Sequence, residues 1–346
     1  MLTPPLPRNL EASMRDLGSA RAATRASSIP DLVRHARVDE DVRARAIPLL
    51  EKALASDEIP EVRSAAAVAL GDLGAHEALS ALLVAVEDGD VHVRQMALNA
   101  LGEIGDVRAL SRLRRALGDG RPEVRYQGII AFCRVACAAG EEAEALEAME
   151  RATGDDDAAV RYIALRLAEE RIDALRSPPP AGGTDQDDEP SQDHAHANPL
   201  VRLLPRAERL LGDPARQVTV VAALFLAKMG QNAGHELIAR VVRGQLRADK
   251  EDEREAVEVA GRFGLRELVP HLERRAWGAM RLVRDTCSFH AKIALCHLGH
   301  PRATAEIARD LGSPKRDVRS AAVVAAGRAS LVELRDAIAA MPLDAV

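Results

Sequence analysis

An arginine that recurs at a fixed interval constrains the fold of this chain more than any other feature. Arg63, Arg94 and Arg125 follow one another at intervals of 31 residues, and Arg161 comes 36 residues later. The sequences around them are alike, because EVRSAAAVALGDLG at 61–74 aligns with HVRQMALNALGEIG at 92–105. A period of this length indicates stacked supersecondary units, each burying its apolar face against its neighbours.

An aspartate precedes each of these arginines by six residues. Aspartate is favoured in turns and at helix N-termini, so it marks the loop that enters a helix. Asp213 keeps the position in a later unit, where Thr219 replaces the arginine. The four aspartates that accompany the arginines are Asp57, Asp88, Asp119 and Asp155.

Each unit is predicted to contain two helices. A shorter segment with leucines at helical spacing, such as HEALSALLVAV at 76–86, comes before each marked segment. We call the first helix of a unit A and the second B. The sequence predicts an all-α fold, an α-solenoid of about eight such repeats, with B helices at 61–73, 91–104, 122–136, 158–171, 214–229, 250–263, 286–298 and 314–328.

The composition agrees with thin layers of closely spaced helices. Hydrophobic residues make up 47% of the 346 residues, but aromatic residues only 2%. Alanine and leucine must therefore fill the core, and both are strong helix formers. Small side chains also allow neighbouring helices to approach closely.

A segment rich in proline, glycine and acidic residues divides the chain. Residues 177–199 have almost no apolar side chains, so we expect a disordered acidic linker there. We expect capping helices at 1–39, well-marked repeats at 40–176, and degenerate repeats with a C-terminal cap at 200–346. In the degenerate half, Glu253 stands where the repeat has arginine.

Charge and targeting signals exclude several classes of protein. The net charge is -6, and most of it lies in the acidic segment, which argues against nucleic acid as the partner. Four cysteines are too few for a disulfide scaffold. No signal peptide and no apolar run of about 18 residues is present, so we expect no membrane span and a cytoplasmic location.

The pattern Asp…Val-Arg-x-x-Ala-x-x-Ala-Leu-Gly-x-Leu/Ile-Gly resembles the HEAT repeat, and more narrowly the short HEAT-like repeats of the phycobilin (PBS) lyase type. The resemblance covers about residues 40–175 closely and 200–340 more loosely. It implies an armadillo-like superhelix with B helices along the concave side. It does not fix a function, because the family includes scaffolds, lyase subunits and a metal-dependent hydroxylase.

We interpret the recurring arginines as a structural ladder. On the helix at 91–104, Arg94 lies on the flank where the adjacent repeat is expected, so it should reach a carboxylate or carbonyl there. The alternative, anion binding, is disfavoured because every arginine comes with its aspartate. The predicted ladder consists of Arg63, Arg94, Arg125 and Arg161 with Asp57, Asp88, Asp119 and Asp155.

The outward face of the B helices is the predicted partner-binding surface. Both tyrosines of the chain, Tyr126 and Tyr162, occupy the same outward position in adjacent repeats. Tyrosine and arginine are frequent interface anchors, although packing on the next helix is an equal alternative for the tyrosines. The predicted stripe on the concave side consists of Gln95, Asn99, Tyr126, Ile130, Tyr162 and Arg166.

Candidate metal and redox residues do not form a recognisable site. Cys287 and His290 are one helical turn apart, but Cys296 points to another side of the same helix. Other candidates are the pairs His76-Glu77 and His235-Glu236, the neighbours Cys133 and Cys137, the nearby His297 and His300, and the linker residues His194 and His196. We therefore expect no catalytic residue, metal ion or cofactor, and no nucleotide or hydrolase motif occurs.

Three functions remain as hypotheses. The first is a non-enzymatic scaffold that binds a protein partner on the concave face. The second, implied only by the resemblance, is a lyase-like or lyase-accessory subunit. The third is a HEAT-like nucleic-acid-binding protein, which would need a basic face with stacking aromatic residues.

Overall fold

The structure is a computed structural model that describes residues 8–176, 198–278 and 287–341. These residues form α-helices and short 3-10 turns, and no strand occurs among them, so the predicted all-α solenoid is confirmed. Contacts divide the chain into two compact units, residues 1–167 and 168–346, and the division falls within one helix.

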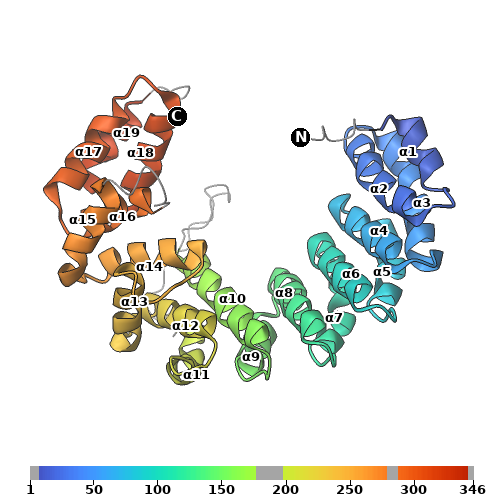
Figure 1. The fold of residues 1–346 in the computed structure, drawn as a ribbon, viewed down its shortest axis with the longest axis horizontal. Helices are drawn as coiled ribbons and strands as arrows, with labels where there is room; N and C mark the ends of the chain where they lie inside the picture. Colours follow the sequence, from blue (N-terminus) through green and yellow to red (C-terminus); the bar gives the residue numbers. More distant parts are fainter. Residues whose placement is uncertain (1–7, 177–197, 279–286, 342–346) are drawn as a thin grey trace, which may run out of the picture. The chain divides into compact units, whose positions relative to one another are not determined.

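The helices of the first unit form two layers (Figure 1). The A helices are α1 (Leu10–Asp16), α3 (Glu40–Ser56), α5 (Leu79–Ala85), α7 (Leu110–Ala116) and α9 (Glu142–Ala152). The B helices are α2 (Ala22–Ala36), α4 (Pro60–Asp72), α6 (Val91–Ile104), α8 (Pro122–Ala138) and α10 (Ala158–Arg176), which continues into the second unit. From α2 to α8, each B helix packs on its own A helix, and α2, α4 and α6 each pack on the next B helix along the chain.

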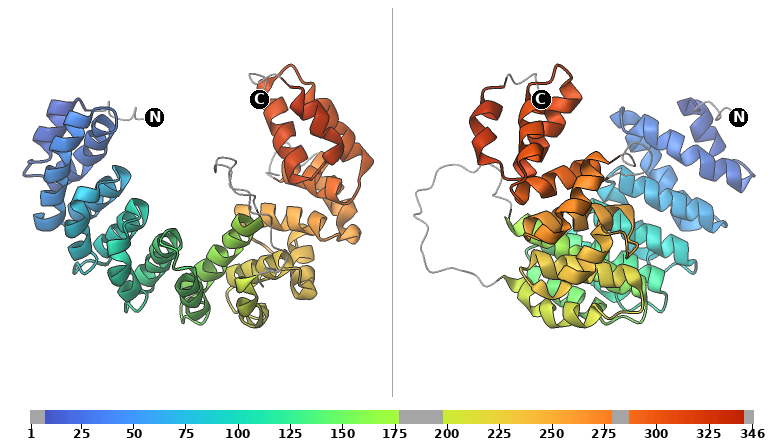
Figure 2. Two further views of the ribbon diagram at one scale, coloured as in Figure 1. Left: turned by 180° about the vertical axis from the view of Figure 1, so that it is seen from behind. Right: turned by 60° about the vertical axis from the view of Figure 1, so that its left-hand side comes forward.

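The second unit repeats the same pairing (Figure 2). Its A helices are α11 (Leu204–Leu210), α13 (His235–Val242), α15 (Val269–Trp277) and α17 (Pro301–Leu311). Its B helices are α12 (Arg216–Lys228), α14 (Lys250–Arg262), α16 (Ser288–His297) and α18 (Arg316–Arg328), and α19 (Arg335–Ala339) follows.

The recurring aspartate shapes the turn before each B helix. Asp88 Oδ1 accepts the backbone N–H of Asp90 at 2.8 Å, and Asp57, Asp119 and Asp155 make the same bond two residues onward. Such a bond closes a tight turn with the side chain in place of the backbone. At the other end of α6, Gly105 caps the helix with φ of 72°, which glycine adopts without strain.

Small aliphatic side chains fill the core. On α6, the buried residues are Val93, Ala97, Leu98, Ala100, Leu101 and Ile104, together with Gly102. These residues recur every three or four positions, so one broad face of the helix is buried. The hydrophobic spacing read from the sequence therefore decides which face of each B helix enters the core.

The observed helices agree closely with the predicted B helices. Helix α6 spans the predicted 91–104, and α12 spans Arg216–Lys228 within the predicted 214–229. The N-terminal region differs from a simple cap, because α2 stacks on α4 as a further B helix. Residues 177–197 of the predicted linker, including His194 and His196, lie outside the described residues, and a 3-10 turn begins at Pro199.

Candidate functional site

The recurring arginine of α4, α6 and α8 contacts the aspartate of the following repeat. Arg63 donates to both carboxylate oxygens of Asp88 at 2.8 Å, and Arg125 donates to Asp155 at 2.8 and 2.7 Å. Each arginine also donates to the carbonyl of the aspartate six residues before it, at 2.9 Å for Arg63. One guanidinium thus ties its own turn to the next repeat in a bidentate, charge-assisted contact.

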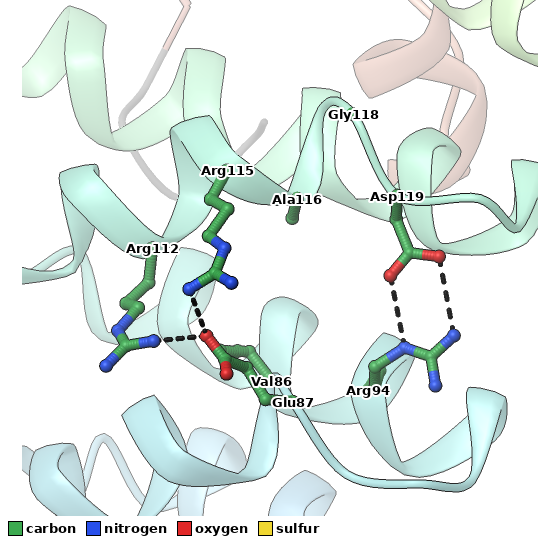
Figure 3. A pocket seen from close by; sticks show the side chains of 8 residues that line it. All are labelled: Val86, Glu87, Arg94, Arg112, Arg115, Ala116, Gly118 and Asp119. Carbon is green, nitrogen blue, oxygen red and sulfur yellow. Dashed lines mark hydrogen bonds and ion pairs between the residues drawn. The ribbon is translucent and has the colours of Figure 1, made fainter.

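The rung formed by Arg94 is slightly longer and borders a small cavity (Figure 3). Its Nε lies 3.2 Å from Asp119 Oδ2, and Arg94 also donates to the carbonyl of Asp88 at 2.9 Å. On the other side of the cavity, Arg112 and Arg115 of α7 both contact Glu87. Every guanidinium in this cavity therefore has a carboxylate partner.

A further rung in the N-terminal region was missed by sequence reasoning. Arg25 of α2 donates to the two carboxylate oxygens of Asp57 at 2.7 and 2.8 Å. The residue six positions before Arg25 is Ser19, whose carbonyl accepts from Arg25 at 2.9 Å. The missing aspartate marker hid this repeat in the sequence, although the backbone contact is the same.

The ladder arginines lower the pKa of Asp57, Asp88 and Asp155. Hydrogen bonds from Arg25 hold the pKa of the Asp57 carboxyl below its usual range, despite partial burial. Burial raises the pKa of Asp88 and of Asp155, but the hydrogen bonds from Arg63 and Arg125 outweigh it, so the net pKa of each is lowered. The carboxylates therefore stay charged at neutral pH.

The residues of the predicted stripe lie on three successive B helices and are half-buried: Gln95 and Asn99 on α6, Tyr126 and Ile130 on α8, and Tyr162 and Arg166 on α10. Gln95 Nε2 donates to the carbonyl of Glu123 at 3.1 Å, and Asn99 Oδ1 accepts from Gln127 Nε2 at 3.1 Å. The two amides of α6 thus contact α8. Tyr126 and Ile130 each keep part of their apolar surface in contact with water.

A row of exposed ion pairs runs beside the stripe, and the sequence had not revealed it. Arg37, directly after α2, lies 3.3 Å from Asp72 at the end of α4. Glu103 of α6 pairs with Arg134 of α8. These pairs link neighbouring B helices, and solvent weakens each of them.

The second unit contains buried charges on its B helices that sequence reasoning also missed. The Lys228 side chain is 4% exposed, and its Nζ lies 3.1 Å from Glu169 and 2.8 Å from Glu255. Glu258 is equally buried and contacts His290 Nδ1 at 2.5 Å and Arg328 at 2.8 Å. Buried charges are tolerated when paired in this way.

The candidate metal and redox residues are spread over separate contacts. His290 binds Glu258, His300 Nε2 lies 3.0 Å from Glu273, and the imidazole of His297 contacts the carbonyl of Arg328. Cys287 and Cys296 are buried. Over residues 8–176, 198–278 and 287–341, no group of three or more His, Cys, Asp or Glu residues could hold a metal ion.

The remaining candidates are similarly separated. Cys133 is buried, with its Sγ 3.8 Å from the carbonyl oxygen of Ala145, and Cys137 is half-buried. Glu77 pairs with Arg43, whereas His235 begins α13 in the second unit. No helix of the described residues is both long and apolar enough to span a membrane.

Comparisons with known proteins agree with this architecture. Residues 47–133 match the family model described as HEAT repeats. No curated protein matches the chain. Among solved structures, the YibA protein of Escherichia coli is similar at 17% identity with a TM-score of 0.53, over 84% of this chain and 93% of YibA.

Two further solved structures resemble this chain. Kap95p, solved with RanGDP, is similar at 14% identity with a TM-score of 0.50, over 92% of this chain and 44% of Kap95p. The CpcE–CpcF complex of phycocyanin lyase from Nostoc is similar at 16% identity with a TM-score of 0.38, over 88% of this chain and 94% of that chain. At these identities the likeness extends to the fold alone.

Proposed function

We propose that this chain, a protein built of HEAT repeats, is a non-enzymatic scaffold that binds a protein partner on the B-helix stripe. The observation that supports the proposal is that Tyr126 and Ile130, one helical turn apart on α8, are both half-buried. Amphipathic aromatic side chains with part of their surface in water are frequent anchors of interfaces.

The charges of the first unit support the same proposal. The ladder arginines are held by aspartates and backbone carbonyls, so they serve contacts between repeats. The stripe beside them combines amides, tyrosines and an aliphatic side chain, which is a mixture typical of protein interfaces. Kap95p, a protein of similar fold, binds another protein, RanGDP.

The test removes the two aromatic rings and measures partner recovery. In affinity purification with quantitative mass spectrometry, Tyr126→Ala with Tyr162→Ala should lose the partner that the wild-type chain recovers. Two anchors that each contribute at least about 1 kcal/mol predict a loss of affinity of roughly 30-fold or more once the partner is purified.

A matched control lies on the other layer. Val84 on α5 and Val107 in the 3-10 turn before α7 are both exposed and belong to the A-helix side of the repeats. Val84→Ala with Val107→Ala should leave recovery unchanged. Equal recovery by the tyrosine variant and this control, with far-ultraviolet circular dichroism unchanged, would contradict the proposed stripe.

A further inference from the structure

A glycine sets the distance between neighbouring B helices. Gly71 of α4 lies eight residues after Arg63, and a Cβ there would lie 2.8 Å from the Cα of Ala100 on α6. Gly102 holds the same position on α6, and its Cβ would lie 3.0 Å from that of Ala131 on α8. Only glycine permits such an approach, so the small residue lets consecutive B helices touch.

Helix α2 lacks this glycine. Because Arg25 forms the same rung as Arg63, the residue eight positions later is the equivalent of Gly71, and that residue is Val33. The alanines that face Gly71 and Gly102 lie six residues after Arg94 and Arg125, so the alanine that faces Val33 on α4 is Ala69, six residues after Arg63. Val33 and Ala69 both line a cavity of about 640 Å³ between α2 and α4, which is the groove considered below.

The second unit follows the same rule. Gly261 of α14 packs directly on Ala294 of α16. The next B helix in the chain, α16, has Cys296 at the glycine position, and a cavity of about 420 Å³ lies between α16 and α18. That cavity is lined by Ala325, the residue that faces Cys296. In α2 and α16, a larger residue at the glycine position therefore coincides with an open groove.

The groove between α2 and α4 has an apolar floor and a basic rim. Ile29, Val33 and Val68 contribute aliphatic surface. The side chains of Arg34 and Arg37 at the rim are 49% and 55% exposed. One half-exposed carboxylate, Asp72, lies beside them, 3.3 Å from Arg37. Arg34 lies 3.4 Å from Asp31, which it shares with Arg8, and it also donates to the carbonyl of Arg8 at 2.7 Å.

The groove is continuous with the proposed partner-binding stripe. Val68 of α4 occupies the position that Asn99 has on α6 and Ile130 on α8, so the groove forms the α4 end of the same row of residues. A partner that follows the stripe across α8 and α6 reaches the groove next. The residues that line the groove include two half-exposed guanidinium groups and one carboxylate, and this surplus of positive charge favours a negatively charged group on that partner.

We propose that the groove between α2 and α4 receives a bulky aliphatic or aromatic side chain of the partner protein, next to a carboxylate of that partner that meets Arg34 and Arg37. This inference rests on the proposed scaffold function, because it assigns the occupant to the same partner. The groove would bury the partner's apolar side chain away from water, and the arginines at the rim would favour a negative charge beside that side chain.

The probe for this chemistry is 8-anilinonaphthalene-1-sulfonate, which joins aromatic rings to an anion. We expect one probe molecule to bind per chain with a rise in fluorescence. Ala65→Trp, which fills the groove, should weaken binding about tenfold or more. The matched Ala321→Trp lies in the groove between α16 and α18, whose rim carries Asp310, Asp317 and Lys292, and it should leave probe binding unchanged.

A second pair of measurements tests the rim without altering the floor. Arg34→Gln with Arg37→Gln should weaken binding of the anionic probe about three- to tenfold, but should not affect its neutral analogue N-phenyl-1-naphthylamine. Arg121→Gln, an exposed arginine of the loop before α8, is the control. These variants keep the inference testable if Ala65→Trp fails to fold.

Several results would overturn the inference. The inference fails if Ala65→Trp binds the probe as well as the wild type does, or if the arginine changes weaken the binding of both probes equally. It also fails if light scattering shows a dimer that Ala65→Trp dissociates, or if deletion of residues 1–7 tightens probe binding. The dimer would make a second copy the occupant, and the deletion result would make it the chain's own N-terminus. Partner recovery that depends on the tyrosines but not on Ala65 would refute the groove and leave the scaffold proposal standing.

Discussion

The rung between Arg63 and Asp88 offers the sharpest test of how the repeats are held together. Arg63→Gln removes two charge-assisted hydrogen bonds to Asp88 and one to the carbonyl of Asp57. The two side chains are only 17% and 15% exposed, so solvent replaces these bonds poorly. Hydrogen bonds to charged groups contribute about 1.5–3 kcal/mol, and Asp88 keeps its bond from the N–H of Asp90.

We therefore expect Arg63→Gln to reduce the free energy of unfolding by about 2–3 kcal/mol. For a unit of this size each kcal/mol lowers the melting temperature by about 2–4 °C, which gives a shift of roughly 4–12 °C. Thermal and urea unfolding followed by circular dichroism measure both quantities. Arg121→Gln, an exposed arginine outside the ladder, should leave the melting temperature unchanged.

A double-mutant cycle isolates the pair. Arg63→Gln combined with Asp88→Asn should give a coupling energy of about 1–2 kcal/mol, because the two residues share one contact. Since repeats contact only their neighbours, hydrogen exchange should rise first in α4 and α6. A coupling energy near zero, or a melting temperature lowered by less than about 1 °C, would refute the idea that the ladder stabilises the stack.

Two predictions concern the second unit. Lys228→Met should lower the free energy of unfolding by about 3–5 kcal/mol, because Glu169 and Glu255 lose their shared cation inside the protein. Urea unfolding measures this effect, with the exposed Lys250→Met as the control. An equal loss of stability in both variants would contradict the prediction. Burial raises the pKa of Glu306, but hydrogen bonds from Trp277 and two cations lower it to about 2. The ionised Glu306 should stabilise the fold fully at a pH above about 4.3, the pKa of glutamate in the unfolded chain, and this stabilisation should disappear as the pH falls through about 2. The difference in unfolding free energy between wild type and Glu306→Gln should therefore shrink from pH 5 to pH 2. A difference that stays constant would exclude this account.

The sequence anticipated the repeat contact of Arg94 but not its counterpart Arg25. Arg94 was expected to reach a group of the neighbouring repeat, and its guanidinium faces Asp119. Arg25 lies in the region for which the sequence predicted capping helices, and Ser19 stands where the later repeats have aspartate. The partner of Arg25 is Asp57, which the sequence had already marked, so that aspartate was the available signal.

The degenerate repeats show why chemistry in the second unit could not be read in advance. Glu253 replaces the ladder arginine, and in the structure it pairs with Arg275 of α15 at 2.8 Å. The charge order of the contact is reversed, so a pattern search for arginine misses it. Lys228 at the end of α12 resembles an ordinary basic residue at a helix C-terminus, and only the packing of α10 and α14 around it makes it a buried cation.

The sequence by itself determined the helices, their period and the face that each one buries, because those follow from local spacing of apolar residues, turn-forming aspartates and terminal glycines. Tertiary structure decided how far apart neighbouring B helices lie. That distance depends on which side chain of one helix meets which side chain of the next, as with Gly71 and Ala100 in one repeat and Val33 and Ala69 in another. A valine reads as one more core residue in the sequence, and only its position opposite Ala69 shows that it borders a groove.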